Sequence, residues 1–285
     1  MLYTLSCRVL LAMTLFLSNN LTAQTCCQLE TMGDYQLLGG SLDFIRAHAE
    51  PLPFIFVSKE GGEMVSFPTK DSTGKAGGFL IKAKKKSKKW LLVYQEWWGL
   101  NDYVKKQAEA FYTDLGGEVN VLALDMYDGK VATKREDAGK YMGEAKEERL
   151  ESIMQGAVKF AGKRAQFASV GWCFGGGLSL KSAIVEGKRA VGCLMYYGMP
   201  VKDVEKLKTL NTDVKGYFSG REKWINKTVV EEFAKNMTTA GKVLDYKIYD
   251  AEHGFANPSN PAFDKAATEE TYAASIKYLK MKFGI

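Results

Sequence analysis

The residues best suited to covalent chemistry lie at positions 171–177, which read Gly-Trp-Cys-Phe-Gly-Gly-Gly and place Cys173 among small residues. The apolar residues 167–170 before them predict a strand, and residues 178–185 after them predict a helix. A strained junction of this kind presents a nucleophile at its tip, and side chains in place of the flanking glycines would collide with the neighbouring elements. Amide N–H groups at the start of the helix favour a thiolate. The pattern predicts a nucleophilic cysteine; the alternative is a small cysteine buried in a glycine-rich turn.

A cysteine nucleophile needs a base and a group that orients the base. The chain has two histidines, His48 and His253. His253 lies on a loop after the predicted strand 243–249, which favours it as the base over a structural surface histidine. His48 lies in a segment without such a context and is not expected to take part. Glu222, after the predicted strand 215–218, is expected to orient the imidazole, unless it belongs with its basic neighbours to a charged, solvated turn.

A further carboxylate, Glu96, follows the predicted buried strand 90–94. In folds that present a nucleophile on a strand–turn–helix junction, the loop after the third strand donates an N–H group to the developing oxyanion. The amides of Trp97 and Phe174 are therefore the expected oxyanion-hole donors. Glu96 would then lie at the mouth of the site. The alternative is that Glu96 caps the helix that is predicted to begin near Asp102.

Strands and helices alternate from residue 63 onward. The predicted strands are 64–69, 78–82, 90–94, 119–124, 167–170, 190–197, 215–218 and 243–249, and the predicted helices are 102–115, 136–161, 178–185, 228–239 and 264–282. Turn residues at 71–75 predict a hairpin between the first two strands. Apolar strands that alternate with helices predict an α/β fold with a mostly parallel central sheet covered by helices on both faces.

The order Cys173, Glu222, His253 is the nucleophile–acid–histidine order of α/β-hydrolases. Together with their surroundings, these residues resemble the dienelactone hydrolase family over about residues 62–285. The motifs that show the resemblance are Gln95-Glu96-Trp97-Trp98-Gly99, residues 171–176, Glu222 with Trp224-Ile225, and His253-Gly254-Phe255. The resemblance implies an α/β-hydrolase fold, a thiol nucleophile that opens cyclic enol esters, and a glutamate at position 96 that helps to generate the thiolate once substrate binds.

The chain departs from the family at the positions that select the substrate. The family's acid is commonly aspartate, and arginines that clamp a substrate carboxylate would fall within residues 125–130 and at position 257. Here Lys130 and Asn257 stand at or near these places, and neither offers the bidentate fork of arginine. Neutral or weakly anionic esters or lactones are therefore expected rather than dienelactone itself. The residues expected to contact the substrate are Trp98, Tyr127, Lys130, Trp224 and Asn257.

These observations predict an exported hydrolase of carboxylic esters or lactones with a Cys-His-Glu triad. The alternative is a non-catalytic or redox-sensing thiol protein on the same scaffold. No metal or cofactor is implied, and the expected partner is a small-molecule substrate. The net charge of +6 is spread over interspersed acids and bases, which indicates solubility rather than nucleic-acid binding. The basic run 84–89 is expected to be a solvated loop rather than a polyanion or membrane patch.

The N-terminus has the pattern of a signal peptide over residues 1–23, with Arg8 before a short apolar run and small residues at its end. This predicts export to the periplasm or beyond; a short transmembrane anchor is the alternative. Residues 24–61 are expected to form an extension with a short helix at 42–49 and a short strand or tether at 54–57. Residues 62–285 are expected to form the catalytic domain. Cys26 and Cys27 suit free thiols or an intermolecular bond, and a lipid anchor is a minor alternative.

Overall fold

A computed structural model describes residues 30–285, with side chains described from residue 34. The predicted signal peptide and three of the five cysteines therefore lie outside the described residues. Within them, one eight-stranded sheet has the order β1-β2-β4-β3-β5-β6-β7-β8. Its strands are β1 Glu63–Pro68, β2 Lys75–Ile81, β3 Lys89–Tyr94, β4 Asn120–Leu124, β5 Gln166–Trp172, β6 Ala190–Tyr196, β7 Val214–Ser219 and β8 Leu244–Tyr249. The prediction of an α/β fold with a mostly parallel sheet is confirmed.

The central strands β3, β4 and β5 are parallel and buried along almost their whole length. Such strands are covered on both faces, which explains why their sequences are continuously apolar rather than alternating. The predicted hairpin is also present: β1 and β2 pair antiparallel, and Thr69 N–H donates to Gly74 O at 3.0 Å. Gly74 has φ +71°, a conformation that favours glycine.

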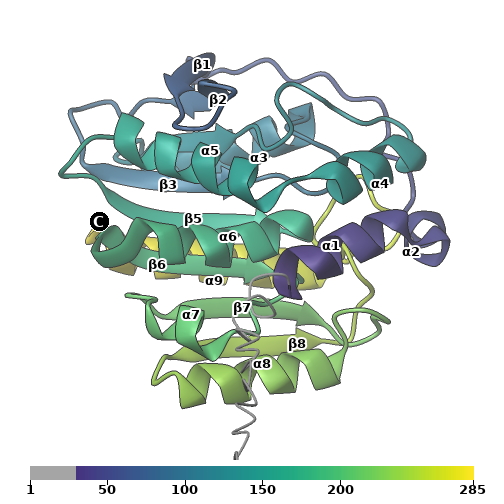
Figure 1. The fold of residues 1–285 in the computed structure, drawn as a ribbon. Coiled ribbons are helices and arrows are strands. Elements are labelled where there is room, and N and C mark those ends of the chain that lie inside the picture. Colours follow the sequence, from purple (N-terminus) through teal and green to yellow (C-terminus); the bar gives the residue numbers. More distant parts are fainter. Residues whose placement is uncertain (1–29) are drawn as a thin grey trace, which may run out of the picture.

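Helices cover both faces of the sheet (Figure 1). They are α1 Glu30–Gly40, α2 Leu42–Ala47, α3 Asp102–Asp114, α4 Arg135–Glu144, α5 Glu147–Phe160, α6 Phe174–Glu186, α7 Val204–Lys208, α8 Lys227–Thr239 and α9 Lys265–Phe283. In Figure 1, α5 and α6 lie in front of the sheet, while α3 and α9 lie behind it. Residues 136–161 are largely helical, as predicted, but they form two helices, because the chain turns extended at Ala145 (ψ 123°) and starts α5 two residues later.

The N-terminal segment, residues 34–62, crosses the end of the sheet at which the parallel strands finish (Figure 1). α1 packs on α4 at a close crossing: a Cβ on Gly39 would lie 2.6 Å from Gly139 O. α2 follows with Ser41 as its N-cap, which accepts from Phe44 N–H. Residues 54–57 form a tether rather than a strand, and Phe56 N–H donates to Asp102 Oδ2 at 2.9 Å. The segment is thus anchored at both ends.

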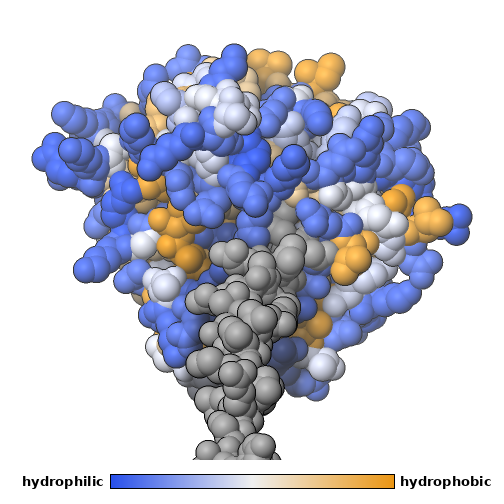
Figure 2. Space-filling view, viewed as in Figure 1, coloured by the Kyte–Doolittle hydropathy of each residue, from blue (hydrophilic) through white to orange (hydrophobic). Residues whose placement is uncertain are grey.

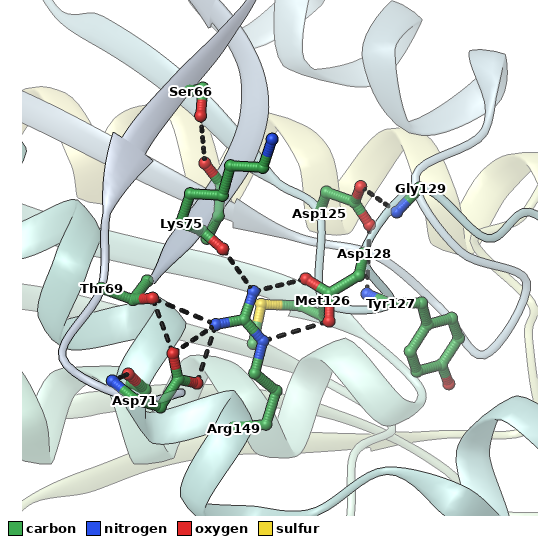
Figure 3. A network of polar contacts seen from close by, with 12 residues as sticks. Ser66, Thr69, Asp71, Lys75, Asp125, Met126, Tyr127, Asp128, Gly129 and Arg149 are labelled. Carbon is green, nitrogen blue, oxygen red and sulfur yellow. Dashed lines mark hydrogen bonds and ion pairs between the residues drawn. The ribbon is translucent and has the colours of Figure 1, made fainter. Parts of the chain in front are cut away.

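A partly buried arginine ties the hairpin to the loop after β4 (Figure 3). Arg149 on α5 lies 2.8 Å from Asp71 Oδ2 in the hairpin turn, and it pairs with Asp128 after β4. The hydrogen bond from Thr69 and then Arg149 lower the pKa of Asp71, so this carboxylate is charged at neutral pH. The network fixes the loop that carries Tyr127, next to the nucleophile's helix.

The face of the molecule drawn in Figure 2 is mostly hydrophilic, with smaller hydrophobic areas between the polar groups. None of the helices in the described part of the chain combines the length and apolar character that crossing a bilayer requires.

Candidate active site

Cys173 lies at the tip of a strained turn between β5 and α6. Its backbone has φ 54° and ψ −119°, which costs a residue with a Cβ roughly 1–3 kcal/mol. The flanking glycines have the role that their spacing predicted. A Cβ on Gly171 would lie 2.0 Å from Gly175 O, and one on Gly175 would lie 2.3 Å from Tyr94 O. Only glycine allows the strand, the turn and the helix to approach this closely, and the thiol is held 5% exposed at their junction.

His253 lies between Cys173 and Glu222. Its Nδ1 is 2.9 Å from Glu222 Oε2, and the other side of the ring faces the Cys173 thiol. The contact with Glu222 is a close ion pair rather than a well-aligned hydrogen bond, because the two atoms meet without the geometry of one. Glu222 is itself fixed by Ile225 N–H, which donates to Oε1 at 3.2 Å. Its buried side chain is incompatible with the alternative of a solvated charged turn.

The charges around the imidazole favour its protonated form. Burial by itself lowers the pKa of His253, but the negative charge of Glu222 and then Cys173 outweigh it and raise that pKa well above the usual range. A buried imidazole between a carboxylate and Cys173 can take up the thiol proton, and the imidazolium that results is stabilised by the charges on both sides.

The loop after β3 brings Trp97 against the site. Trp97 is 1% exposed, and a turn closed by Gly99 N–H to Glu96 O precedes α3. Among the described residues, no hydrogen bond involves the N–H of Trp97 or of Phe174. Two free amides on the strand-β3 loop and at the start of α6 are what an oxyanion hole requires.

Glu96 lines a pocket that Trp172, the residue before Cys173, also lines. Asn257 Nδ2 donates to its Oε2 at 2.5 Å, and the pocket, of about 140 Å³, is also lined by Trp172, Tyr197 and Lys106. Burial raises the pKa of Glu96 to about 7, although His253 and Asn257 act against this. The alternative that Glu96 caps α3 is wrong, because Asn101 is the N-cap and accepts from Val104 N–H at 3.1 Å.

The five expected substrate contacts separate into three groups. Asn257 is in the pocket with Glu96. Tyr127 stacks on Phe174 at 5.6 Å, Trp98 packs against Trp97, and Trp224 contacts Phe44 of the N-terminal segment. Lys130 is exposed over the ring of Tyr141 and lines a different pocket from that of Glu96.

His48, which no sequence pattern placed at the site, lies beside it in the structure. His48 is the C-cap of α2 and is 7% exposed, and its ring lies 5.1 Å from that of His253 and 4.7 Å from that of Trp97. One nitrogen of each histidine and the Cys173 sulfur all lie within 4.8 Å of one another. Burial and then the charge of His253 lower the pKa of His48 to about 3, so its ring is neutral at physiological pH. The sequence feature that could have indicated the position of His48 is the short helix α2, which begins after the N-cap Ser41 and ends at His48.

Comparisons with known proteins show the family and the fold. The chain is 26% identical over 239 residues to Protein usf of Aquifex pyrophilus, covering 77% of this chain and 98% of the relative. It is 24% identical over 232 residues to Carboxymethylenebutenolidase 1 of Cupriavidus pinatubonensis, covering 75% and 94%. The fold is similar to the crystal structure of a dienelactone hydrolase-like promiscuous phosphotriesterase, P91, from metagenomic libraries. The TM-score is 0.64 at 18% identity, and the match covers 78% of this chain and 99% of that one.

The sequence model of the dienelactone hydrolase family matches residues 77–283. The match contains β3, the strained turn at Cys173, Glu222 and His253, whereas α1, α2 and His48 precede it. The chain is therefore a hydrolase that belongs to the dienelactone hydrolase family.

Proposed function

We propose that this protein hydrolyses carboxylic esters or lactones through a thioester on Cys173. The observation that supports the proposal most strongly is the position of His253 between the thiol and the buried carboxylate of Glu222. Thiol, imidazole and carboxylate in this order are the parts of a nucleophilic triad, and the strained backbone at Cys173 is typical of a nucleophile on a strand–turn–helix junction.

In the proposed mechanism, the Cys173 sulfur attacks the substrate carbonyl after its proton has passed to His253. The amides of Trp97 and Phe174 stabilise the negative oxygen of the tetrahedral intermediate. His253 then protonates the leaving alcohol, which in a lactone stays attached to the acyl group. A water molecule, deprotonated by the same imidazole, attacks the thioester and releases the acid and the thiol. Glu222 stabilises the imidazolium that forms in both halves.

Glu96 is proposed to respond to the substrate. With a pKa of about 7, it is partly protonated at neutral pH, and Asn257 holds it at the pocket wall. A substrate that enters the pocket competes for Asn257 and frees the carboxylate to act near the nucleophile. Lys106 is a cation among the lining residues, without the paired fork of arginines that would select a dianion. Neutral or weakly anionic esters and lactones are therefore the proposed substrate class.

A panel of nitrophenyl esters, simple lactones and dienelactone tests the proposal. The purified protein should hydrolyse short neutral esters or lactones, and Cys173→Ala should reduce the rate to background. A protein that hydrolyses none of them but forms a sulfenic acid readily at Cys173 would instead support a redox-sensing thiol. A strong preference for dienelactone over neutral esters would contradict the proposed substrate class.

Export to the periplasm or beyond is a further part of the proposal, supported by the sequence pattern at residues 1–23. Mass spectrometry of the protein from its native host should give an N-terminus near Gln24. Soluble protein that retains Met1 would contradict export.

A further inference from the structure

A second histidine reaches the catalytic cysteine from outside the part of the chain that matches the family. His48 is supplied by α2, and α2 is placed by the crossing of α1 and α4 and by the packing of Phe44 against Trp97 and Trp224. The His48 side chain is more than nine-tenths buried, and its Nε2 has no hydrogen-bond partner. A buried, unpartnered imidazole nitrogen costs free energy, which indicates that it has a ligand in some state of the protein.

The other nitrogen of each ring is already oriented. His48 Nδ1 lies 2.7 Å from Phe44 O and must donate to it, which leaves the lone pair on Nε2. His253 Nδ1 faces Glu222, which directs its Nε2 to Cys173. A histidine that binds a metal characteristically donates its other ring N–H to a backbone carbonyl or a carboxylate. Here the Phe44 carbonyl faces Nδ1 of His48, and the Glu222 carboxylate faces Nδ1 of His253.

The three donors match the preferences of Zn²⁺. Zinc binds thiolate sulfur and imidazole nitrogen, and many zinc sites use three protein ligands with a fourth position open. The donor atoms here lie within 4.8 Å of one another. Bonds to a tetrahedral zinc ion would bring them to roughly 3.3–3.6 Å, a change that small side-chain rotations supply.

We propose that His48, Cys173 and His253 form a Zn²⁺ site, and that zinc bound there holds the hydrolase inactive. The one proton that Cys173 and His253 exchange is replaced by bonds from zinc to the sulfur and to His253 Nε2, and that proton passes to solvent. The metal occupies both the attacking sulfur and the lone pair of the proposed base, so attack on an ester and zinc binding exclude each other. The metal site stands on the geometry alone, whereas the inhibition rests on the proposed function.

A cobalt titration of the full chain, freed of metal with EDTA, tests the metal site by a spectrum and needs no measurement of ester hydrolysis. One equivalent of Co²⁺ should produce the near-ultraviolet thiolate-to-cobalt band of a tetrahedral site. His48→Phe, which keeps an aromatic ring against Trp97, and His48→Gln, which keeps polarity, should each weaken binding by ~100-fold or more. Cys173→Ala should abolish the band. Asp43→Asn, on the same helix but facing Lys223 at 3.1 Å, is the matched control and should bind as the native chain does.

Zinc inhibition is then measured as the ratio of ester hydrolysis with and without Zn²⁺ for each variant, so that changes in the metal-free rate cancel. One equivalent should stop the native protein, and the His48 variants should need ~100-fold more zinc. Cobalt binding of equal affinity in the native chain and both His48 variants, or no band at all, would overturn the site. Zinc that accelerates hydrolysis would overturn the inhibitory role. A chain that binds cobalt as described but hydrolyses no ester refutes the proposed function and leaves the metal site supported.

Discussion

Asn257 donates its amide hydrogen to Glu96 across 161 residues of sequence, at an Nδ2–Oε2 distance of 2.5 Å. The sequence suggested Asn257 only as the place of a missing arginine. The structure shows that it holds a carboxylate whose pKa burial raises to about 7. The pKa of Glu96 therefore gives the site a group whose charge changes with pH near neutrality.

Replacement of Glu96 by Gln tests whether its charge restrains the nucleophile. A carboxylate near a thiol disfavours the thiolate by like-charge repulsion. Glu96→Gln should therefore raise the rate at which iodoacetamide modifies Cys173 and lower the turnover of esters. Peptide mass mapping identifies the modified cysteine, and the effect should be strongest above about pH 7, where the native residue is ionised. An alkylation rate equal to that of the native chain would leave Glu96 with no role beyond its bond to Asn257.

Glu222 is expected to be essential for turnover. Glu222→Gln keeps the shape but removes the charge that raises the pKa of His253, so turnover should fall by about 10³–10⁴-fold. The control is Asp250→Asn, because Asp250 is a nearby carboxylate that is exposed and pairs with Arg221 at 3.2 Å. Equal activity losses in the two variants would show that the loop's charge, rather than the Glu222–His253 contact, matters.

The crossing of α1 and α4 is expected to control how firmly the N-terminal segment covers the site. A Cβ on Gly139 would lie 2.8 Å from Gly39 O, whereas one on Gly143 would meet only ordinary contacts at 3.8 Å or more. Gly143→Ala should stabilise the helix by up to about 1 kcal/mol. Gly139→Ala should increase hydrogen exchange in residues 34–48 and speed the alkylation of Cys173. Equal exchange in the two variants would contradict this.

Glu186 is expected to make stability depend on pH. Burial raises its pKa from 4.5 to about 8, despite the hydrogen bond from Ser182 Oγ at 2.7 Å. The folded chain keeps a proton that the unfolded chain loses, so the contribution is full below about pH 4.5 and is lost as the pH rises through about 8. Glu186→Gln should remove this fall and be favoured by up to ~4 kcal/mol more above pH 8 than at acid pH. Urea unfolding at a series of pH values measures the free energy of unfolding of each chain. The same dependence on pH in the native chain and in Glu186→Gln would contradict the prediction.

The fold and the proximity of Cys173, Glu222 and His253 could be predicted because their causes are local. The glycines around Cys173 are required by close backbone contacts at the strand–turn–helix unit, and Glu222 and His253 lie on the loops that follow β7 and β8. The carboxyl ends of neighbouring parallel strands meet at one edge of the sheet, so the sequence order also predicted the proximity of these side chains.

The N-terminal segment could not be predicted in the same way. α1 contains glycines at 33, 39 and 40 and no apolar repeat, so local propensity argues against a helix, and its stability comes from packing on α4. The position of His48 depends on that long-range contact. The bond between Asn257 and Glu96 likewise joins two loops that only the folded sheet brings together.

The central claim is that Cys173 becomes acylated. Rapid quenching of the protein with a slowly deacylated nitrophenyl ester, followed by peptide mass spectrometry, measures this most directly. The account predicts one acyl group on the peptide that contains Cys173, formed in a burst and absent in Cys173→Ala. It also predicts that, in a His253→Gln variant acylated chemically on Cys173, the thioester persists because no imidazole activates water to hydrolyse it. Ester turnover with an unmodified Cys173, or with the acyl group on another residue, would contradict the account.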